Sequence, residues 1–80
     1  MSRARDVVEV VARALAARPD EVLVTEAERR GLTVVELTMA PGELGRVIGR
    51  QGRTATALRT LAAATGEIEG LKVSVDFRDE

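Results

Sequence analysis

Apolar residues recur along this chain with two different periods, and these periods predict the order of helices and strands. The first apolar stripe has helical spacing and contains Val7, Val8, Val11 and Leu15. It predicts a helix that is capped by Ser2 and runs to about Ala17, since the residue before Pro19 avoids helical backbone angles.

Two strands are predicted after this helix. The segment Val22–Arg29 begins with residues that favour strands and then alternates in charge, which is typical of an edge strand. From Leu32 to Met39 apolar and polar residues alternate, and the apolar face contains Val35, Leu37 and Met39. Because Arg30 and Gly31 form a turn between the two segments, they are expected to pair as a hairpin.

Two helices joined by a glycine-rich turn are predicted next. The segment Ala40–Glu43 is expected to begin a short helix, with Pro41 tolerated in its first turn. The second helix is predicted from about Arg53 to Thr65, because no breaker interrupts that segment. Gly66 is expected to end it in the left-handed conformation.

The last element is predicted to be a strand. Residues 71–77 are apolar at odd positions and polar at even ones, and Arg78-Asp79-Glu80 is left as a short polar tail. The order of elements is therefore αββααβ, and the helical crossover between the second and third strands favours parallel pairing. We expect an α+β fold with a three-stranded mixed sheet and helices on one face, formed by residues 1–80 as a single domain.

Positive charge is concentrated around the segment Gly45–Arg53. The whole chain has 12 basic and 13 acidic residues, whereas residues 44–60 contain four arginines and no acid, a local charge of +4. Gly49 and Gly52 let the backbone turn sharply, and the amides of residues 50–52 are expected to point outward together as a cradle for an anion. A basic patch on an otherwise acidic body indicates a polyanionic partner, here a nucleic-acid backbone.

Other phosphate-binding motifs do not match this turn. Dinucleotide-binding turns have a different glycine spacing and join a strand to a helix, and the phosphate loop of NTPases ends in Gly-Lys-Ser or Gly-Lys-Thr. Here Gly52 is followed by Arg53-Thr54. The remaining alternative is a purely structural turn between two helices.

The composition argues against catalysis. The chain has no His, Cys or Tyr, so the commonest acid–base group and the best nucleophile are absent. No metal-ligand spacing is present, and neither a metal nor another cofactor is expected. No apolar run reaches membrane-spanning length and no signal-peptide segment is found, so we expect a cytoplasmic protein.

The motif around the turn resembles the signature of the KH domain. It reads Ile48-Gly49-Arg50-Gln51-Gly52, preceded by Gly45-Arg46-Val47. The order αββααβ resembles the bacterial type II form, and the length resembles the small stand-alone KH proteins of the KhpA family. The resemblance implies a turn that clamps the backbone of about four single-stranded nucleotides, with apolar residues supporting or lining a floor for the bases. The predicted RNA-binding residues are Gly45, Arg46, Val47, Ile48, Gly49, Arg50, Gln51, Gly52 and Arg53.

The same resemblance implies a cellular context. Members of the family are thought to act as RNA chaperones or post-transcriptional regulators, together with a second KH/R3H protein. In some bacteria they are linked to cell shape and cell-wall biogenesis. None of this is visible in the residues themselves.

The helix after the turn carries two apolar stripes. One contains Ala55, Leu58, Ala62 and Thr65, and the other contains Ala57, Leu61 and Ala64. So short a chain cannot cover both, so we expect one stripe to face the sheet and the other, Ala57/Leu61/Ala64, to face a partner. Alternatively, these alanines are simply good helix formers on a surface.

Two hypotheses for the function follow. The main one is a dimeric, single-stranded RNA-binding protein, because Phe77 is the only aromatic residue and a single domain without stacking rings gains from pairing. The alternative is a protein-interaction module in which RNA binding is vestigial.

Overall fold

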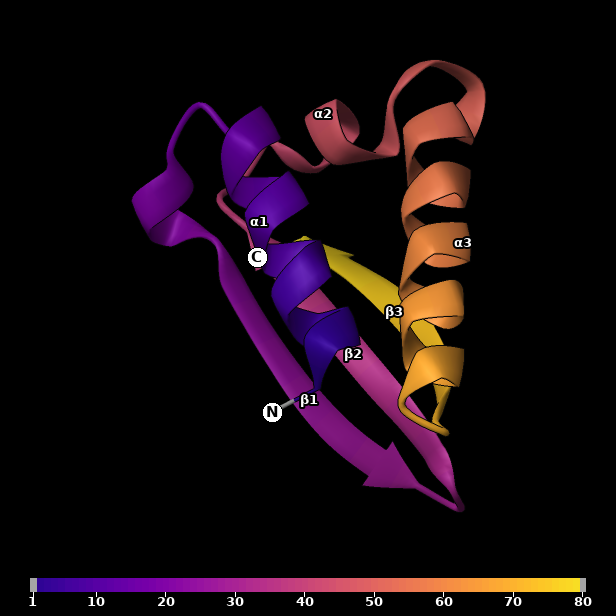
Figure 1. Ribbon diagram of the computed structural model, residues 1–80. Helices are drawn as coiled ribbons and strands as arrows, with labels where there is room; N and C mark the ends of the chain where they lie inside the picture. Colours follow the sequence, from indigo (N-terminus) through magenta and orange to yellow (C-terminus); the bar gives the residue numbers. More distant parts are fainter. Residues whose placement is uncertain (1, 80) are drawn as a thin grey trace.

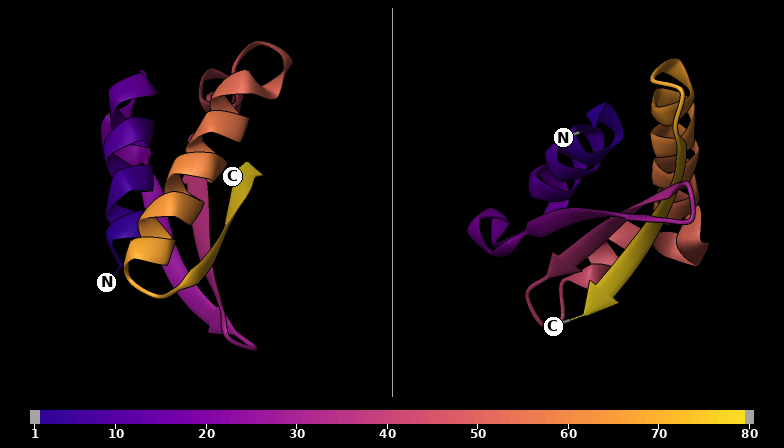
Figure 2. Two further views of the ribbon diagram at one scale, coloured as in Figure 1. Left: turned by 45° about the vertical axis from the view of Figure 1, so that its right-hand side comes forward. Right: turned by 90° about the horizontal axis from the view of Figure 1, so that it is seen from below.

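The computed structural model describes residues 2–79, which form a three-stranded sheet with the long helices on one face (Figure 1; Figure 2, right). Strand β2 (Leu32–Met39) lies in the centre, antiparallel to β1 (Leu23–Arg29) and parallel to β3 (Lys72–Asp79). The predicted α+β class, the order αββααβ and the mixed sheet are confirmed.

Helix α1 (Arg3–Leu15) is capped by Ser2, as predicted, but its buried stripe is not the predicted one. The buried residues are Ala4, Val8 and Ala12. Val7 and Val11 are only half-buried, and Leu15 is 38% exposed. The prediction weighted side-chain size, whereas the closely packed interior selects the small residues that let α1 approach its neighbours.

The hairpin is confirmed. A short 3₁₀ turn, η1 (Pro19–Glu21), leads into β1, which pairs with β2 along its whole length. Arg30 and Gly31 connect the strands with positive φ angles of 53° and 81°. Strand β1 lies at one edge of the sheet, as predicted.

Helix α2 (Leu44–Ile48) begins later than predicted. Pro41 lies in a turn before the helix, which is closed by a 3.1 Å hydrogen bond from the Glu43 amide to the Ala40 carbonyl. The placement of Pro41 in the first helical turn is therefore wrong. Gly42, with φ of 84°, prevents the helix from starting before Glu43.

Helix α3 (Arg53–Ile68) continues past Gly66, so the prediction that Gly66 ends the helix is wrong. Gly66 is buried where α3 lies on β3, and a Cβ atom there would collide with the side chain of Val73. Glycine is needed at this position for close packing. The left-handed glycine after the helix is Gly70, with φ of 74°.

Strand β3 is longer than the predicted segment. Arg78 and Asp79 continue the parallel register with β2 instead of forming a tail, and Glu80 lies outside the described residues.

The core fills the space between the sheet and the helices. Its largest fully buried side chains are Leu37, Met39, Val8, Val35 and Val47.

Candidate functional site

The turn between α2 and α3 has a backbone that requires glycine at its first position. Gly49 ends α2 with φ of 73° and ψ of 178°, a region that is essentially open to glycine alone. Its amide donates a 2.9 Å hydrogen bond to the Gly45 carbonyl. A Cβ atom on Gly49 would also collide with Oγ1 of Thr54, in the first turn of α3. Both the backbone angles and the packing against Thr54 therefore require glycine at position 49.

The second half of the turn is η2 (Arg50–Gly52), in which two residues adopt left-handed angles. Gln51 has φ of 58° and Gly52 has φ of 70°. The Gly52 amide donates to the Gly49 carbonyl at 3.2 Å, so the prediction that it points outward with its neighbours is wrong. Within residues 2–79, the amides of Arg50 and Gln51 find no backbone acceptor. Among the three amides predicted to form the cradle, these two therefore remain without a backbone partner in the described residues.

The arginines at the turn are exposed and largely free of acidic partners. Arg53 donates a 2.9 Å hydrogen bond to Oε1 of Gln51, a neutral side chain. Arg50 and Arg53 form no ion pair within the part of the chain that the structure describes. Of these arginines, Arg46 alone has a carboxylate nearby among the described residues, with its Nε 3.8 Å from Oε1 of Glu43. The turn therefore presents uncompensated positive charge to solvent.

Glu43 lies directly before the helix that carries the turn, and the sequence did not identify it as a structural support of the site. Its side chain is almost completely buried and accepts hydrogen bonds from the amides of Ala17, at 2.6 Å, and Arg18, at 3.2 Å. The Arg18 guanidinium lies 3.7 Å away. Glu43 thus ties the end of α1 to the start of the helix that carries the turn. The one signal in the sequence was an acid immediately before a helix, a favoured position for negative charge.

The predicted apolar residues before the turn divide into two environments. Val47 is fully buried in the core, so it anchors α2 by packing and does not itself reach the surface. Ile48 is half-buried beside Gly49, and Gly45 is exposed. Of the two predicted floor residues, only Ile48 is accessible to a ligand.

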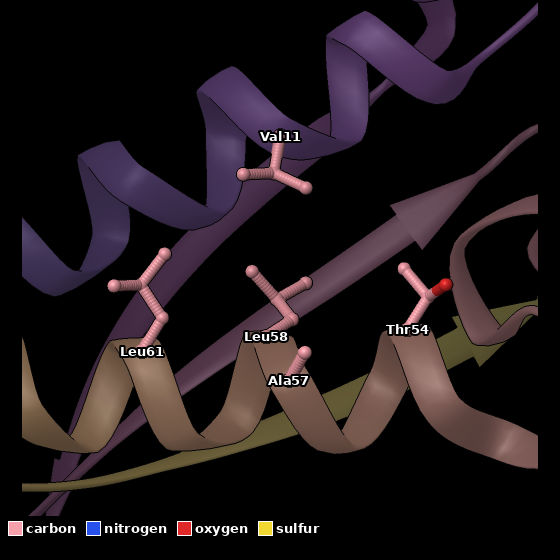
Figure 3. Close-up of a pocket in the computed structure, with 5 residues that line it drawn as sticks. All are labelled: Val11, Thr54, Ala57, Leu58 and Leu61. Carbon is pink, nitrogen blue, oxygen red and sulfur yellow. The ribbon is translucent and has the colours of Figure 1, made fainter.

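The two stripes of α3 face in different directions. Ala55, Leu58 and Ala62 are buried against the core, whereas Ala57 and Ala64 are exposed and Leu61 is 47% exposed. Beside Leu61 lies an open hollow of about 200 Å³ between α1 and α3. Figure 3 shows the side chains that line it, and these are Val11, Thr54, Ala57, Leu58 and Leu61.

The exposed stripe extends one step further than predicted. Ile68 follows Leu61 by two helical turns and is 77% exposed. The sequence signal was its spacing, because the stripe continues at intervals of four, three and four residues: Ala57, Leu61, Ala64 and Ile68.

Two further features are absent from residues 2–79, the part of the chain that the structure describes. No group of three or more acidic side chains is placed to hold a metal ion. None of the described helices has the length and apolar character needed to span a membrane.

Comparisons with known proteins agree with this geometry. A glycine turn between two helices, within an αββααβ fold, defines a KH domain of the type II form. Residues 5–77 match the family model described as "KhpA/KhpB, KH domain". The chain belongs to the KhpA/KhpB KH-domain family.

Individual relatives support the assignment. The chain is similar to "RNA-binding protein KhpA" of Aquifex aeolicus, at 46% identity over 96% of this chain and 98% of the relative. It is 49% identical to the protein of the same name from Mycobacterium bovis, over 94% of this chain and 92% of the relative. The corresponding protein of Treponema pallidum is 38% identical, over 92% of each chain.

One solved structure shares the fold. The crystal structure of Aquifex aeolicus Era Y63A bound to GDP·AlF4⁻ superposes with a TM-score of 0.59 and 18% sequence identity. The match covers 95% of this chain and 29% of that one. At this identity the likeness concerns the fold alone.

Proposed function

We propose that residues 1–80 form one KH domain that binds single-stranded RNA without catalysing a reaction. The carrying observation is the turn Gly49–Gly52, which combines left-handed backbone, two free amides and exposed arginines. A phosphate group accepts hydrogen bonds from outward amides and is attracted by arginine. The names of the relatives, "RNA-binding protein KhpA", support the choice of RNA as the polyanion.

The proposed contacts follow from the geometry of the turn. The amides of Arg50 and Gln51 bind a phosphate, and the guanidinium groups of Arg46, Arg50 and Arg53 surround it. Ile48 supplies the apolar surface next to the first base. A perfect duplex hides its bases and keeps its strands paired, so we expect single strands to bind more tightly.

The clamp is tested by charge reversal at its tip. Arg50→Asp with Gln51→Asp is expected to abolish binding to a single-stranded RNA octamer, because two carboxylates repel the phosphates. Aspartate tolerates the left-handed angles of position 51, so the circular dichroism spectrum is expected to stay native. For the unmodified chain, three arginines predict a log–log dependence of affinity on salt no steeper than about −2.

The hairpin turn offers a matched control. Arg30→Asp with Arg29→Gln makes the same total change of charge at a turn with the same left-handed backbone, because one arginine is reversed and one unit of positive charge is removed. We expect this control to keep most of the affinity. Equal affinity of the two double variants would contradict the clamp, and so would unchanged binding of the Arg50/Gln51 variant.

We also propose that two copies of the chain pair through the exposed stripe of α3. A two-fold interface uses the same patch on both subunits, so a protruding side chain and a cavity must lie on one face. Leu61 is 47% exposed and forms one wall of the hollow that Val11 and Ala57 also line, so both features lie on this face. The stripe Ala57/Leu61/Ala64, extended by Ile68, is the surface we assign to the partner.

Leu61→Asp tests the pairing. A carboxylate cannot be buried unpaired without a large desolvation cost, so the variant is expected to be monomeric in light scattering. Because Leu61 is 47% exposed in the single chain, the variant is expected to stay folded. Thr56→Asp is the control and is expected to stay dimeric, because Thr56 is exposed and lies five residues before Leu61, on another face of α3.

A dimerisation module with vestigial RNA binding is the competing function, and the exposed apolar face is the observation that favours it. An unmodified chain that dimerises but binds no single-stranded RNA would establish this alternative. By family resemblance, the main proposal extends to a cytoplasmic RNA chaperone or post-transcriptional regulator with a KH/R3H partner. It extends in the same way to a role in cell shape and cell-wall biogenesis.

A further inference from the structure

The side chain of Arg59, on α3, contacts two residues of the edge strand β3. Its Cζ atom lies 4.7 Å from the centroid of the Phe77 ring, the only aromatic ring in the chain. Its Nε donates a 3.4 Å hydrogen bond to the Val75 carbonyl. The ring and the carbonyl together restrict the guanidinium plane, as expected for an arginine stacked on an aromatic face.

The charge of Arg59 is uncompensated. Along α1, Arg5 and Arg13 both pair with Glu9, and on β3 Arg78 lies 2.6 Å from Glu36. Among the residues that the structure describes, no carboxylate pairs with Arg59. Arg59 is also exposed, so its charge is accessible to a ligand. One side of its guanidinium rests on Phe77, and the residue remains open to solvent.

Arg59 lies in α3, the helix that begins where the clamp ends. It follows Gly52, the residue before the helix, by seven residues, which is ~10 Å along the helix axis. Because β3 is parallel to β2, its carboxyl end lies at the end of the molecule that carries the turn (Figure 2, left). The interval of ~10 Å corresponds to about three stacked nucleotides at ~3.4 Å each.

We propose that the Arg59–Phe77 pair is a stacking platform for a nucleobase of the RNA strand that leaves the clamp. The inference rests on the proposed function and adds a base-binding site to the backbone contacts of the turn. Bases stack on guanidinium planes as they do on aromatic rings, and such stacking tolerates any base. Phe77 orders the guanidinium in advance, so less freedom is lost when a base stacks on it.

Arg59→Lys separates stacking from charge. Lysine keeps the positive charge but has no plane, so it cannot form the platform. The probe is a single-stranded RNA octamer of adenosines, each time with one adenosine replaced by fluorescent 2-aminopurine. Arg59→Lys is expected to weaken binding about 5- to 30-fold while leaving the salt dependence unchanged. Quenching of 2-aminopurine at one position of the octamer is expected to disappear in the variant.

Arg30→Lys is the matched control, because it makes the same exchange at an exposed arginine on the hairpin turn. It is expected to bind the octamer like the unmodified chain. A second variant, Phe77→Leu, removes the ring that orders Arg59, and its fold is checked by circular dichroism. It is expected to weaken binding as Arg59→Lys does, and the double variant is expected to add little, because both act on one platform.

The outcomes separate this inference from the proposed function. If Arg59→Lys binds and quenches like the unmodified chain while Arg50→Asp/Gln51→Asp loses binding, the platform is wrong and the clamp stands. A reduced salt slope in Arg59→Lys would show a phosphate contact in place of stacking and would also overturn the platform. If the unmodified chain binds no single-stranded RNA, both are wrong.

Discussion

The Arg30–Gly31 turn and the Gln51–Gly52 turn each place a long polar side chain and a glycine in the left-handed conformation. The φ angles are 53° and 81° in the first turn and 58° and 70° in the second. Nothing lies within 4 Å of a Cβ atom built on Gly31 or on Gly52. At the level of the local backbone, the two turns are nearly the same.

Their surroundings differ. The hairpin turn joins two paired strands, and Arg29 beside it lies 3.8 Å from Glu36. The second turn is preceded by Gly49, which packs against Thr54, and its arginines at positions 50 and 53 have no carboxylate partner among residues 2–79. Left-handed backbone therefore makes a turn in both places. The second turn is a candidate site because Gly49 packs against Thr54 and because the charges of Arg50 and Arg53 have no acidic partner among the described residues.

The largest expected difference concerns the glycine that has no counterpart in the hairpin. Gly49→Ala forces alanine into a region open to glycine alone and against Thr54, so a loss of about 3 kcal/mol in the free energy of unfolding is expected. Gly31→Ala meets no neighbour and is expected to cost about 1 kcal/mol. Urea denaturation measures both. Thr54→Ala in the Gly49→Ala background is expected to recover part of the loss, and equal costs for the two alanines would refute the packing argument.

A smaller difference is expected between the acids beside the two turns. Glu43→Ala removes a buried carboxylate that accepts hydrogen bonds from the amides of Ala17 and Arg18, at a cost of about 2 kcal/mol. Glu36→Ala removes ion pairs with the exposed Arg29 and Arg78 and is expected to cost less than about 1 kcal/mol.

Chemical denaturation of both variants tests this comparison. Glu43→Gln keeps one acceptor oxygen and is expected to restore most of the stability that alanine loses. If Glu36→Ala proves the more destabilising variant, the structural importance assigned to Glu43 is wrong.

The smallest effect concerns the tie between α1 and the hairpin. Ser2 accepts a hydrogen bond from the Arg5 amide and donates its hydroxyl to Glu26 on β1, which holds the pKa of Glu26 below its ordinary value. Ser2→Ala is expected to cost about 1 kcal/mol near pH 7, mainly through the lost helix cap.

The pH dependence separates the cap from the carboxylate. A carboxyl group with a lower pKa in the folded state stabilises the fold above its unfolded pKa and loses that effect as the pH falls through the folded pKa. The stability difference between the unmodified chain and Ser2→Ala is therefore expected to shrink below about pH 4. A difference that stays constant from pH 7 to pH 3 would show that Glu26 contributes nothing.

The sequence by itself determined the order of elements, the hairpin, the parallel crossover and the position of the glycine turn. These features depend on local signals, which are the period of apolar residues, the conformational freedom of glycine and the length of a connection. The stripe Ala55/Leu58/Ala62 was also assigned correctly to the core, because the helical period of α3 separates it from Leu61.

Only the tertiary structure decided which contacts those elements make. Gly66 was taken for a helix end because its contact with Val73 joins a helix to a strand. The stripe of α1 was misplaced because close packing selected Ala4 and Ala12 over larger residues. Glu43 with the amides after α1, and Arg59 with Phe77, are pairs of residues far apart in the sequence. Local periodicity carries no information on such pairs, since it describes each element alone, whereas packing depends on how two elements meet.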